Sequence, residues 1–506
     1  MSKVEQKLLF INMEYSQAEI NEPINVDVLA QYFPKELFNK NNTFFIYRDI
    51  DDKNYFEIEQ YDIILISSKI SSFNELQKIL ELCKNKIVIL GGILAICAAD
   101  KLAYIYRNVI FNTGEGEINL EILLRLAYSV ESIKELKKII KQQKIPNITF
   151  WDENEKAVYF TRKEVCDLKT QGCPRHYKVS EIIKQNGLVR METSRGCPWN
   201  KCSFCIMPWK YCNVKWRMFS YSKIEEEIDL LIKSGAKQII FTDEDFIGNY
   251  DHIITLCSII EKISRKYKNK VFFGGSTSVL TLLGLGEDLD FCLARMKEVG
   301  IFLLFMGIES GSDSQLLRFN KGVSSKENEK IIYELQKYRF QIDVGFIMFD
   351  ADTTMKELEE NLDFIERTGL INSISRFAKK LRITPHTRFF QEYKRRNLIT
   401  SDLDIDELFY VYKFTDPLIN LISDYIEKMD SEILKESYHL QYVLRSTNTL
   451  EQKEMAQKRL AFLRSCSYNF LRTCINEYKE KKKISPETIL TIYNVCLERE
   501  GQYECD

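Results

Sequence analysis

The sequence has no apolar run long enough to cross a bilayer. Its longest strongly apolar run, residues 87–99, has 13 residues with two glycines inside it, whereas a membrane-spanning helix needs about 20. Residues 1–13 contain only a short apolar stretch and no small-residue cleavage site of a signal peptide. We therefore expect no membrane span and a cytoplasmic protein.

The sequence also has almost no net charge. Lysine and arginine number 71 against 73 aspartate and glutamate, so the chain as a whole has no field that would gather nucleic acid. Hydrophobic residues make up 45% and charged residues 28% of the 506 positions, which is typical of a globular protein and excludes a disordered or fibrous one. This length suggests about three domains, and we expect no nucleic-acid partner.

The hydrophobic pattern predicts two α/β units followed by helices. In residues 1–135, short apolar runs at 7–13, 61–68, 86–90 and 109–111 alternate with helix-like stretches, which predicts parallel strands of a doubly wound sheet. Residues 136–185 show no sustained period and are interpreted as a connector. Alternation resumes over 186–400, which predicts a second parallel unit, open or closed into a barrel. Residues 401–506 show helical spacing of leucine, isoleucine and tyrosine, which predicts a helical C-terminal domain.

Three of the fourteen cysteines, Cys197, Cys202 and Cys205, lie within nine residues just after the first strand of the second unit. Clustered thiolates select zinc, copper(I) or an iron-sulfur cluster. A structural zinc needs four ligands, but the nearest further cysteine is Cys212, and residues 180–250 contain no histidine. Three thiolates around a 4Fe-4S cluster would leave one iron open to a substrate or cofactor. A zinc-stabilised binding module remains the alternative.

The stretch Arg-Met-Glu-Thr-Ser-Arg-Gly-Cys-Pro-Trp-Asn-Lys-Cys-Ser-Phe-Cys over residues 190–205 resembles the signature of radical S-adenosylmethionine enzymes, in particular their cobalamin-binding branch. The family commonly has three residues between the first two cysteines, and this chain has four. Residues 241–248, 307–312 and 319–322 follow in the order of that branch's later strands. The resemblance implies a central partial (β/α)6 TIM-type barrel in which Cys197, Cys202 and Cys205 bind a 4Fe-4S cluster. It further implies that S-adenosylmethionine is contacted by Phe204, Ser276, Glu309 and Ser310.

The first domain resembles the Rossmann-like cobalamin-binding domain of the same branch. Glycines at carboxyl strand ends let the backbone approach a ligand, and hydroxyls can bond its amides. The residues expected at the cobalamin are Ser67, Ser68, Gly91, Gly92, Gly114, Glu115, Gly116 and Glu117. Because the first 150 residues contain no histidine, a bound cobalamin would be base-off without histidine.

The resemblance implies a methyltransferase acting at an unactivated carbon of a ribosomally made peptide or an antibiotic-like small molecule. A 5'-deoxyadenosyl radical would take a hydrogen atom from the substrate, and methylcobalamin would deliver the methyl group. The partner would be an electron donor such as flavodoxin or ferredoxin. The alternative keeps both cofactors but performs a radical cyclisation, ring contraction or rearrangement. A transfer-RNA methylthiotransferase is disfavoured, because the first 150 residues hold only Cys83 and Cys97, too few for its second cluster.

The sequence does not decide the role of two further groups of residues. Asp243, Glu244 and Asp245 form an acidic run at a predicted strand end, where function and a solvated loop are about equally plausible. Cys173 and His176 in the connector could face the active site, although single residues of these types are more often structural.

Overall fold

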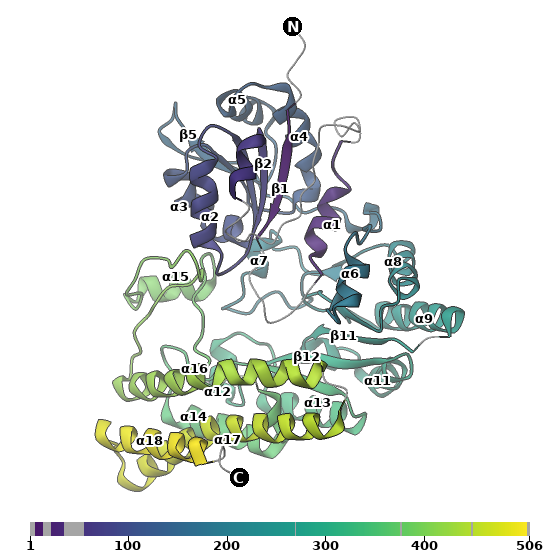
Figure 1. Ribbon diagram of the computed structural model, residues 1–506. Coiled ribbons are helices and arrows are strands. Elements are labelled where there is room, and N and C mark those ends of the chain that lie inside the picture. The colour runs from purple at the N-terminus through teal and green to yellow at the C-terminus, as the bar shows by residue number, and fades with distance from the viewer. Residues whose placement is uncertain are drawn as a thin grey trace.

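The computed structural model describes residues 6–13, 22–34, 55–268, 270–374, 377–446 and 449–502. An N-terminal α/β unit stands above a second α/β unit, and long C-terminal helices pack beneath the latter (Figure 1). The order agrees with the expected sequence of a Rossmann-like domain, a radical-enzyme barrel and a helical domain.

The N-terminal unit is a six-stranded sheet whose strands follow chain order. The first four strands are parallel and almost wholly buried, which confirms the four strands predicted from apolar runs. Alternate strand residues enter two separate apolar clusters, so helices cover both faces of the sheet. The four strands are β1 (Leu8–Asn12), β2 (Ile63–Ser68), β3 (Ile87–Gly92) and β4 (Val109–Asn112). One face is covered by α2 (Phe73–Leu82) and α3 (Ile93–Ile105). The other face is covered by α1 (Ile24–Ala30), α4 (Leu120–Ser129) and α5 (Ile133–Gln143).

The sheet continues into the region interpreted as a connector. Strands β5 (Ile148–Asp152) and β6 (Ala157–Phe160) add to β4 in antiparallel fashion. No residue of the edge strand β6 is fully buried, so its apolar pattern is weak, and this is why the sequence did not reveal it. Helix α6 (Val179–Lys184) then leads into the second unit.

The second unit is an open, parallel half-barrel. Its five strands lie in chain order, and a single parallel bridge between Val344 and Ile374 extends it by one further position. All five strands lie within residues 186–400, where the sequence predicted an alternation of strands and helices. They are β7 (Val189–Met191), β10 (Gln238–Phe241), β11 (Phe272–Thr277), β12 (Ile301–Glu309) and β13 (Gln341–Phe346).

Helices lie between these strands in the chain. Two of the longer ones, α13 and α14, begin with a capping box, in which a serine or threonine and a glutamate three residues later satisfy each other's backbone N–H groups. The helices are α8 (Tyr221–Lys233), α9 (Tyr250–Tyr267), α10 (Val279–Leu283), α11 (Leu289–Glu298), α12 (Asp313–Arg318), α13 (Ser325–Lys337) and α14 (Met355–Thr368).

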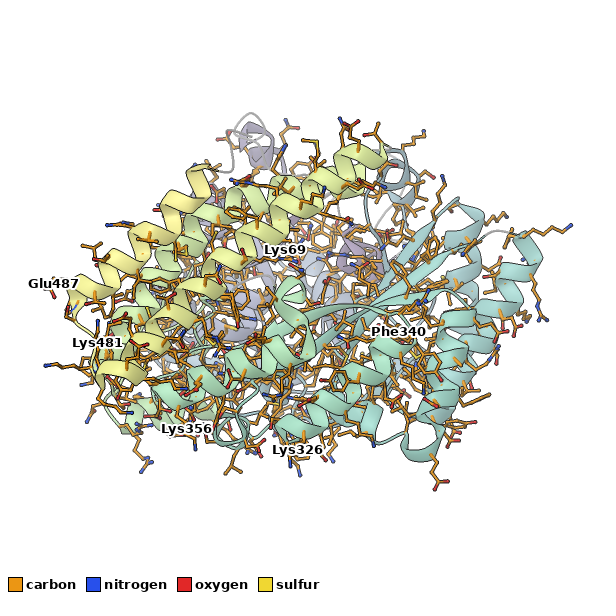
Figure 2. The ribbon with its side chains drawn as sticks, turned by 90° about the horizontal axis from the view of Figure 1, so that it is seen from below. Lys69, Lys326, Phe340, Lys356, Lys481 and Glu487 are labelled. Atoms are coloured by element: carbon orange, nitrogen blue, oxygen red, sulfur yellow. The ribbon has the colours of Figure 1, made fainter. Side chains whose placement is uncertain are left out.

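The C-terminal part is helical as expected, but its long helices begin at Pro417 rather than near residue 401. Before them come the short helix α15 (Arg388–Arg395) and antiparallel bridges at Ile383–Tyr410 and Ile399–Tyr412. The long helices α16 (Pro417–Ser446), α17 (Leu450–Lys481) and α18 (Pro486–Gln502) lie together when viewed from below (Figure 2). Within the described ranges, no helix combines the length and apolar character needed to cross a membrane.

Candidate active site

The three clustered cysteines lie in a loop closed at its base by two short antiparallel strands. Strand β8 (Ser194–Arg195) pairs with β9 (Arg217–Met218), and the short helix α7 (Met207–Lys210) lies between them. Gly196 starts the loop with a φ of 91°, and a Cβ there would lie 1.9 Å from the carbonyl oxygen of Lys215. Only glycine therefore fits at the start of the cysteine loop.

The loop is held from the other side by the barrel and by α15. The Ser203 N–H donates to the carbonyl of Phe319 at 2.9 Å, and the Ser203 carbonyl accepts from the Phe389 N–H at 3.1 Å. The Trp199 indole N–H donates to the Asn320 carbonyl at 2.8 Å. Segments more than a hundred residues apart thus fix the conformation of the loop.

The three cysteines are half-buried and share one cationic neighbour. Burial raises the pKa of Cys202 to about 12 and that of Cys205 to about 11, while the charge of Lys321 acts to lower both values. Because a metal ligand must be a thiolate, binding a cluster would release these protons, and the Lys321 ammonium would favour the charged form.

Within the described residues, Glu22, Asp27 and His176 form the group whose potential metal-ligand atoms all lie within 4.8 Å of one another, and the three cysteines form no such group.

Cys212 does not join the three. Its electrostatic neighbours include Lys163, Glu115 and Arg217, where the N-terminal unit meets the base of the loop. The neighbours of Cys202, by contrast, are Lys321, Cys205 and Cys197. The remaining candidate for a local fourth thiolate therefore lies away from the cluster site.

The acidic run after β10 braces the loop and is not a solvated surface loop. Asp243 is buried and accepts hydrogen bonds from the Thr193 hydroxyl and the Ser194 hydroxyl, each at 2.6 Å. Glu244 accepts from the Gly196 N–H at 2.8 Å and pairs with Lys210. These carboxylates hold the strand end and the first residue of the cysteine loop in place.

Two of the expected S-adenosylmethionine contacts lie on the cysteine-loop side of the barrel. Phe204 packs edge-on against Phe319, with ring centroids 5.7 Å apart, and the Lys321 ammonium lies 6.0 Å from its ring centre. Glu309, the last residue of β12, lies 3.4 Å from Lys321 and has a φ of 66°, a left-handed conformation that is rare outside glycine. Lys321, which was not among the expected site residues, therefore lies near both residues and the cysteines.

The other two expected contacts are placed differently. Ser276 is half-buried at the penultimate position of β11. Ser310 is fully buried, and its hydroxyl lies 2.6 Å from the Gln315 side-chain oxygen and 2.8 Å from that of Asn361. These partners occupy the Ser310 hydroxyl, so any ligand contact at this position would come from the backbone.

A cavity of about 240 Å³ lies at the carboxyl ends of the N-terminal strands. Most of the residues expected at a cobalamin line this cavity. Ser68 does not line it, and its hydroxyl donates to the Gly91 carbonyl at 2.6 Å. Asn25 and Asn112 also line it, and the sequence did not single them out. The expected residues that line it are Ser67, Gly91, Gly92, Gly114, Glu115, Gly116 and Glu117.

The far wall of this cavity belongs to the second unit. Arg195, which directly precedes the cysteine loop, lies 3.0 Å from Glu115 and 2.7 Å from Glu117, and Arg217 lies 2.8 Å from Glu115. Burial alone would raise the pKa of Glu115, but Arg217 and Arg195 lower it to about 2. A permanently charged network therefore joins the glycine-rich turn of one unit to the cysteine loop of the other.

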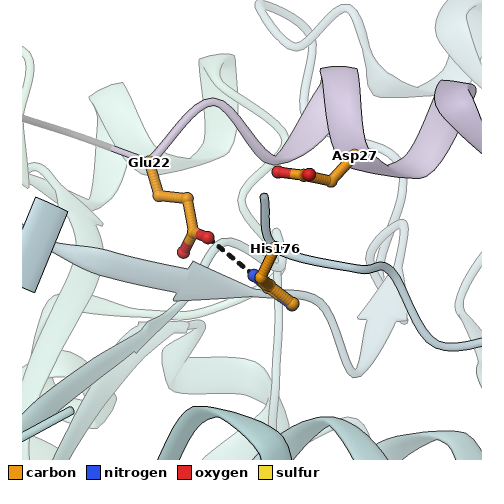
Figure 3. A group of neighbouring side chains, drawn as sticks. All are labelled: Glu22, Asp27 and His176. Carbon is orange, nitrogen blue, oxygen red and sulfur yellow. Dashed lines mark hydrogen bonds and ion pairs between the residues drawn. The ribbon is translucent and has the colours of Figure 1, made fainter. Parts of the chain in front are cut away.

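A second buried ionic group connects the two units away from the cavity. His176 lies 2.7 Å from Glu22, just before α1, and 2.9 Å from Glu227 on α8. Figure 3 shows the contact between His176 and Glu22, with Asp27 nearby. Burial favours the neutral imidazole, but the two carboxylates raise the pKa of His176 to about 9. Both ring nitrogens are engaged, so this group is an ionic latch between the units and not a metal site.

Comparisons with known proteins agree with this architecture. Residues 191–365 match the family model described as the Radical SAM superfamily. Among curated proteins, the chain is 27% identical over 305 residues to 4'-phospho-dehydrooxetanocin synthase of Priestia megaterium, covering 57% of this chain and 39% of that protein. It is 25% identical over 249 residues to an uncharacterized methyltransferase of Pyrococcus horikoshii, covering 49% of each. The chain thus spans less than half the length of these two relatives.

Solved structures share the fold over nearly the whole chain. The cobalamin-dependent S-adenosylmethionine radical enzyme OxsB with aqua-cobalamin bound matches 98% of this chain and 80% of its own, with a TM-score of 0.82 and 20% identity. The radical S-adenosylmethionine methyltransferase TsrM from Kitasatospora setae matches 93% of this chain and 99% of its own, with a TM-score of 0.64 and 14% identity. At these identities the likeness establishes the fold. The three cysteines lie inside the range that the family model matches. The chain therefore carries a radical S-adenosylmethionine domain over residues 191–365. Domains of this family use a 4Fe-4S cluster and S-adenosylmethionine.

Proposed function

We propose that this protein is a cobalamin-dependent radical S-adenosylmethionine enzyme that methylates an unactivated carbon of a peptide or an antibiotic-like small molecule. The observation that carries the proposal is the position of Arg195. Its side chain lines the cavity at the N-terminal strand ends and binds Glu115 and Glu117, while its backbone leads into the loop of Cys197, Cys202 and Cys205. A corrinoid site and a cluster site would then be adjacent.

The residues of the loop fit a 4Fe-4S cluster with one open iron. Cys197, Cys202 and Cys205 would hold three irons, and Lys321 would offset the negative charge of the thiolates. Glu309 and Phe204 lie on the same side as Lys321 and would orient S-adenosylmethionine at the open iron. When bound, the cluster and S-adenosylmethionine supply reductive radical chemistry, and the protein contributes binding, orientation and charge.

The cavity fits one part of a corrinoid. A Cβ on Gly91 would meet no atom closer than 3.9 Å, so this glycine leaves open space that a side chain would fill. The volume of about 240 Å³ is below the roughly 300 to 1,000 Å³ of typical ligand pockets. It would therefore receive an end of the corrinoid, such as the nucleotide tail, and Asn25 and Asn112 would offer amides to it.

One finding favours the non-methylating alternative. The relative from Priestia megaterium is named as a synthase of 4'-phospho-dehydrooxetanocin and not as a methyltransferase. A cyclisation, ring contraction or rearrangement with the same two cofactors is therefore the second candidate. The relative from Pyrococcus horikoshii, named as a methyltransferase, supports the first.

The test is metal and corrinoid analysis of anaerobically purified, cobalamin-supplemented protein, followed by turnover. We expect about four irons and one cobalt per chain, loss of iron in Cys202→Ala, and retention of iron in Cys212→Ala, whose thiol lies apart. Zinc in place of iron would refute the proposal.

Candidate peptides and small molecules are then incubated with reductant and S-adenosylmethionine. A product heavier by one CH2 unit supports methyl transfer. 5'-Deoxyadenosine accompanied by a product without added CH2 supports the alternative. Iron without cobalt would keep the radical enzyme and refute the cobalamin half.

A further inference from the structure

Two residues in the wall of the N-terminal cavity come from the segment that directly follows the cysteine loop. They are Lys210, the last residue of α7, and Tyr211, which comes next in the chain. Tyr211 is only 2% exposed, and its hydroxyl bonds a carboxylate of the protein. The cavity and the cysteine loop therefore meet at these two residues.

A single carboxylate links this part of the wall to the start of the loop. The Tyr211 hydroxyl donates to Glu244 Oε1 at 2.8 Å, and the Lys210 ammonium lies 3.1 Å from the same oxygen. The other oxygen, Oε2, accepts from the Gly196 N–H at 2.8 Å, and Gly196 directly precedes Cys197. One oxygen of Glu244 thus holds the cavity wall, and the other holds the loop.

The same part of the wall is also linked to the end of the loop. The Tyr211 N–H donates to the Met207 carbonyl at 2.9 Å, and the Lys210 N–H donates to the Ile206 carbonyl at 2.9 Å. The backbone of Met207 in turn hydrogen-bonds to the Cys205 thiol. A displacement of Tyr211 would therefore act on both ends of the loop.

We propose that Tyr211, Lys210 and Glu244 couple occupancy of the cavity to the order of the cysteine loop, so that a corrinoid and the cluster strengthen each other's binding. The proposal rests on the proposed function, which assigns a corrinoid to the cavity and a cluster to the loop. The three side chains are positioning residues, because they act on the loop through Gly196 and through the turn of α7.

The sign of the coupling follows from conformational freedom. A corrinoid group packed against Lys210 and Tyr211 would fix both side chains on Glu244, and Glu244 would then fix the Gly196 N–H. The loop would lose less conformational entropy when its three cysteines close on a cluster, which favours cluster binding. Because coupling between two binding sites is reciprocal, a bound cluster must favour the corrinoid by the same factor.

The test measures the affinity for aquacobalamin by anaerobic absorbance titration of the full chain, with and without its cluster. We expect the wild type to bind aquacobalamin about 10-fold more tightly when the cluster is present, a factor within the usual range of coupling. Tyr211→Phe keeps the ring in the wall and removes only the hydroxyl. It should therefore keep the affinity of the cluster-free protein and bring the ratio of the two affinities close to one.

Tyr493→Phe is the matched control. The Tyr493 hydroxyl also donates to a glutamate, Glu432, at 3.2 Å, and its ring is also buried. It belongs to α18, which lies at the other end of the molecule from the N-terminal unit (Figure 1). This variant loses the same kind of hydrogen bond and should keep the wild-type ratio.

Hydrogen exchange of the cluster-free protein gives a second readout that needs no turnover. The peptides to follow cover residues 196–206, none of which lines the cavity. Aquacobalamin should slow their exchange in the wild type and in Tyr493→Phe, but not in Tyr211→Phe.

A purely structural role of Tyr211 has a different outcome. In that case Tyr211→Phe would weaken aquacobalamin binding equally in both cluster states, and this result would overturn the coupling. A wild-type ratio close to one would also overturn it and would leave the proposed function intact. Failure of the wild type to bind aquacobalamin, or absence of iron from it, would overturn the proposed function and the coupling with it.

Discussion

The ionic latch at His176 predicts a pH-dependent attachment of α1. The pKa of His176 is about 9 in the folded protein against a usual value of 6.5. A shift of this size is worth about 3 kcal/mol, since one pKa unit corresponds to about 1.4 kcal/mol. Removing one partner of a buried ion pair costs about 3 to 5 kcal/mol, which agrees. His176→Gln should therefore increase the opening equilibrium of α1 by about 100-fold at pH 6.5.

The sign of the pH dependence follows from the raised pKa. Stabilisation by the imidazolium is fully present below about pH 6.5 and is lost as the pH rises through about 9. The difference between the wild type and His176→Gln should therefore shrink toward pH 9.5, where the native imidazole is neutral as well. Glu227 also pairs with Lys223, and Glu22 also accepts from the Arg190 N–H at 3.0 Å, so both carboxylates keep a partner in His176→Gln and the effect should be local.

The assay is hydrogen exchange of peptides that cover α1 and residues 172–183, at matched pH in both proteins. His439→Gln is the matched control, because His439 is exposed on α16. It should leave exchange of α1 unchanged. Equal protection of α1 in the wild type and in His176→Gln at pH 6.5, or a difference that does not vary with pH, would refute this account of the latch.

The remaining predictions concern the cysteines and the glycines. Cys202→Ala should lose iron and its absorbance near 400 nm, whereas Cys212→Ala should keep both, as iron analysis will tell. Gly92→Ala should destabilise the N-terminal unit by about 3 to 5 kcal/mol in urea unfolding, because Gly92 has a φ of 91° and a Cβ would lie 2.2 Å from the Ser68 carbonyl. Gly286→Ala, also at positive φ but with no atom within 4 Å, should cost only about 1 kcal/mol. Equal costs at the two glycines would contradict the steric argument.

The first four strands of the N-terminal sheet, β1 to β4, could be predicted because each is a short, nearly continuous apolar run. In a parallel sheet covered on both faces, every side chain is buried, so burial alone marks the strand. The exceptions in that sheet are β5, which is fully buried but lies in the region interpreted as a connector, and β6, an edge strand with no fully buried residue. The information that identifies it lies in its pairing with β5, for example Phe150 with Tyr159, and not in its own composition.

The candidate site was only partly predictable, because its charges pair over long distances in the chain. The sequence marks the three cysteines by their spacing alone. It gives no sign that Arg195 pairs with Glu115, 80 residues away, or that His176 pairs with Glu22, 154 residues away. The sequence also gives no sign that the Ser310 hydroxyl, just after β12, lies within hydrogen-bond distance of the Gln315 and Asn361 side chains, 5 and 51 residues away.

The additional residue between Cys197 and Cys202 has a structural explanation. Asn200 takes a left-handed conformation, with a φ of 53°, which asparagine tolerates better than most residues. Its neighbours are tied to the barrel, since the Trp199 indole donates to the Asn320 carbonyl and the Asn320 amide donates to the Lys201 carbonyl. The four residues between Cys197 and Cys202 are thus anchored to the barrel through Trp199 and Lys201, and the next part of the loop is anchored to the barrel and α15 through Ser203.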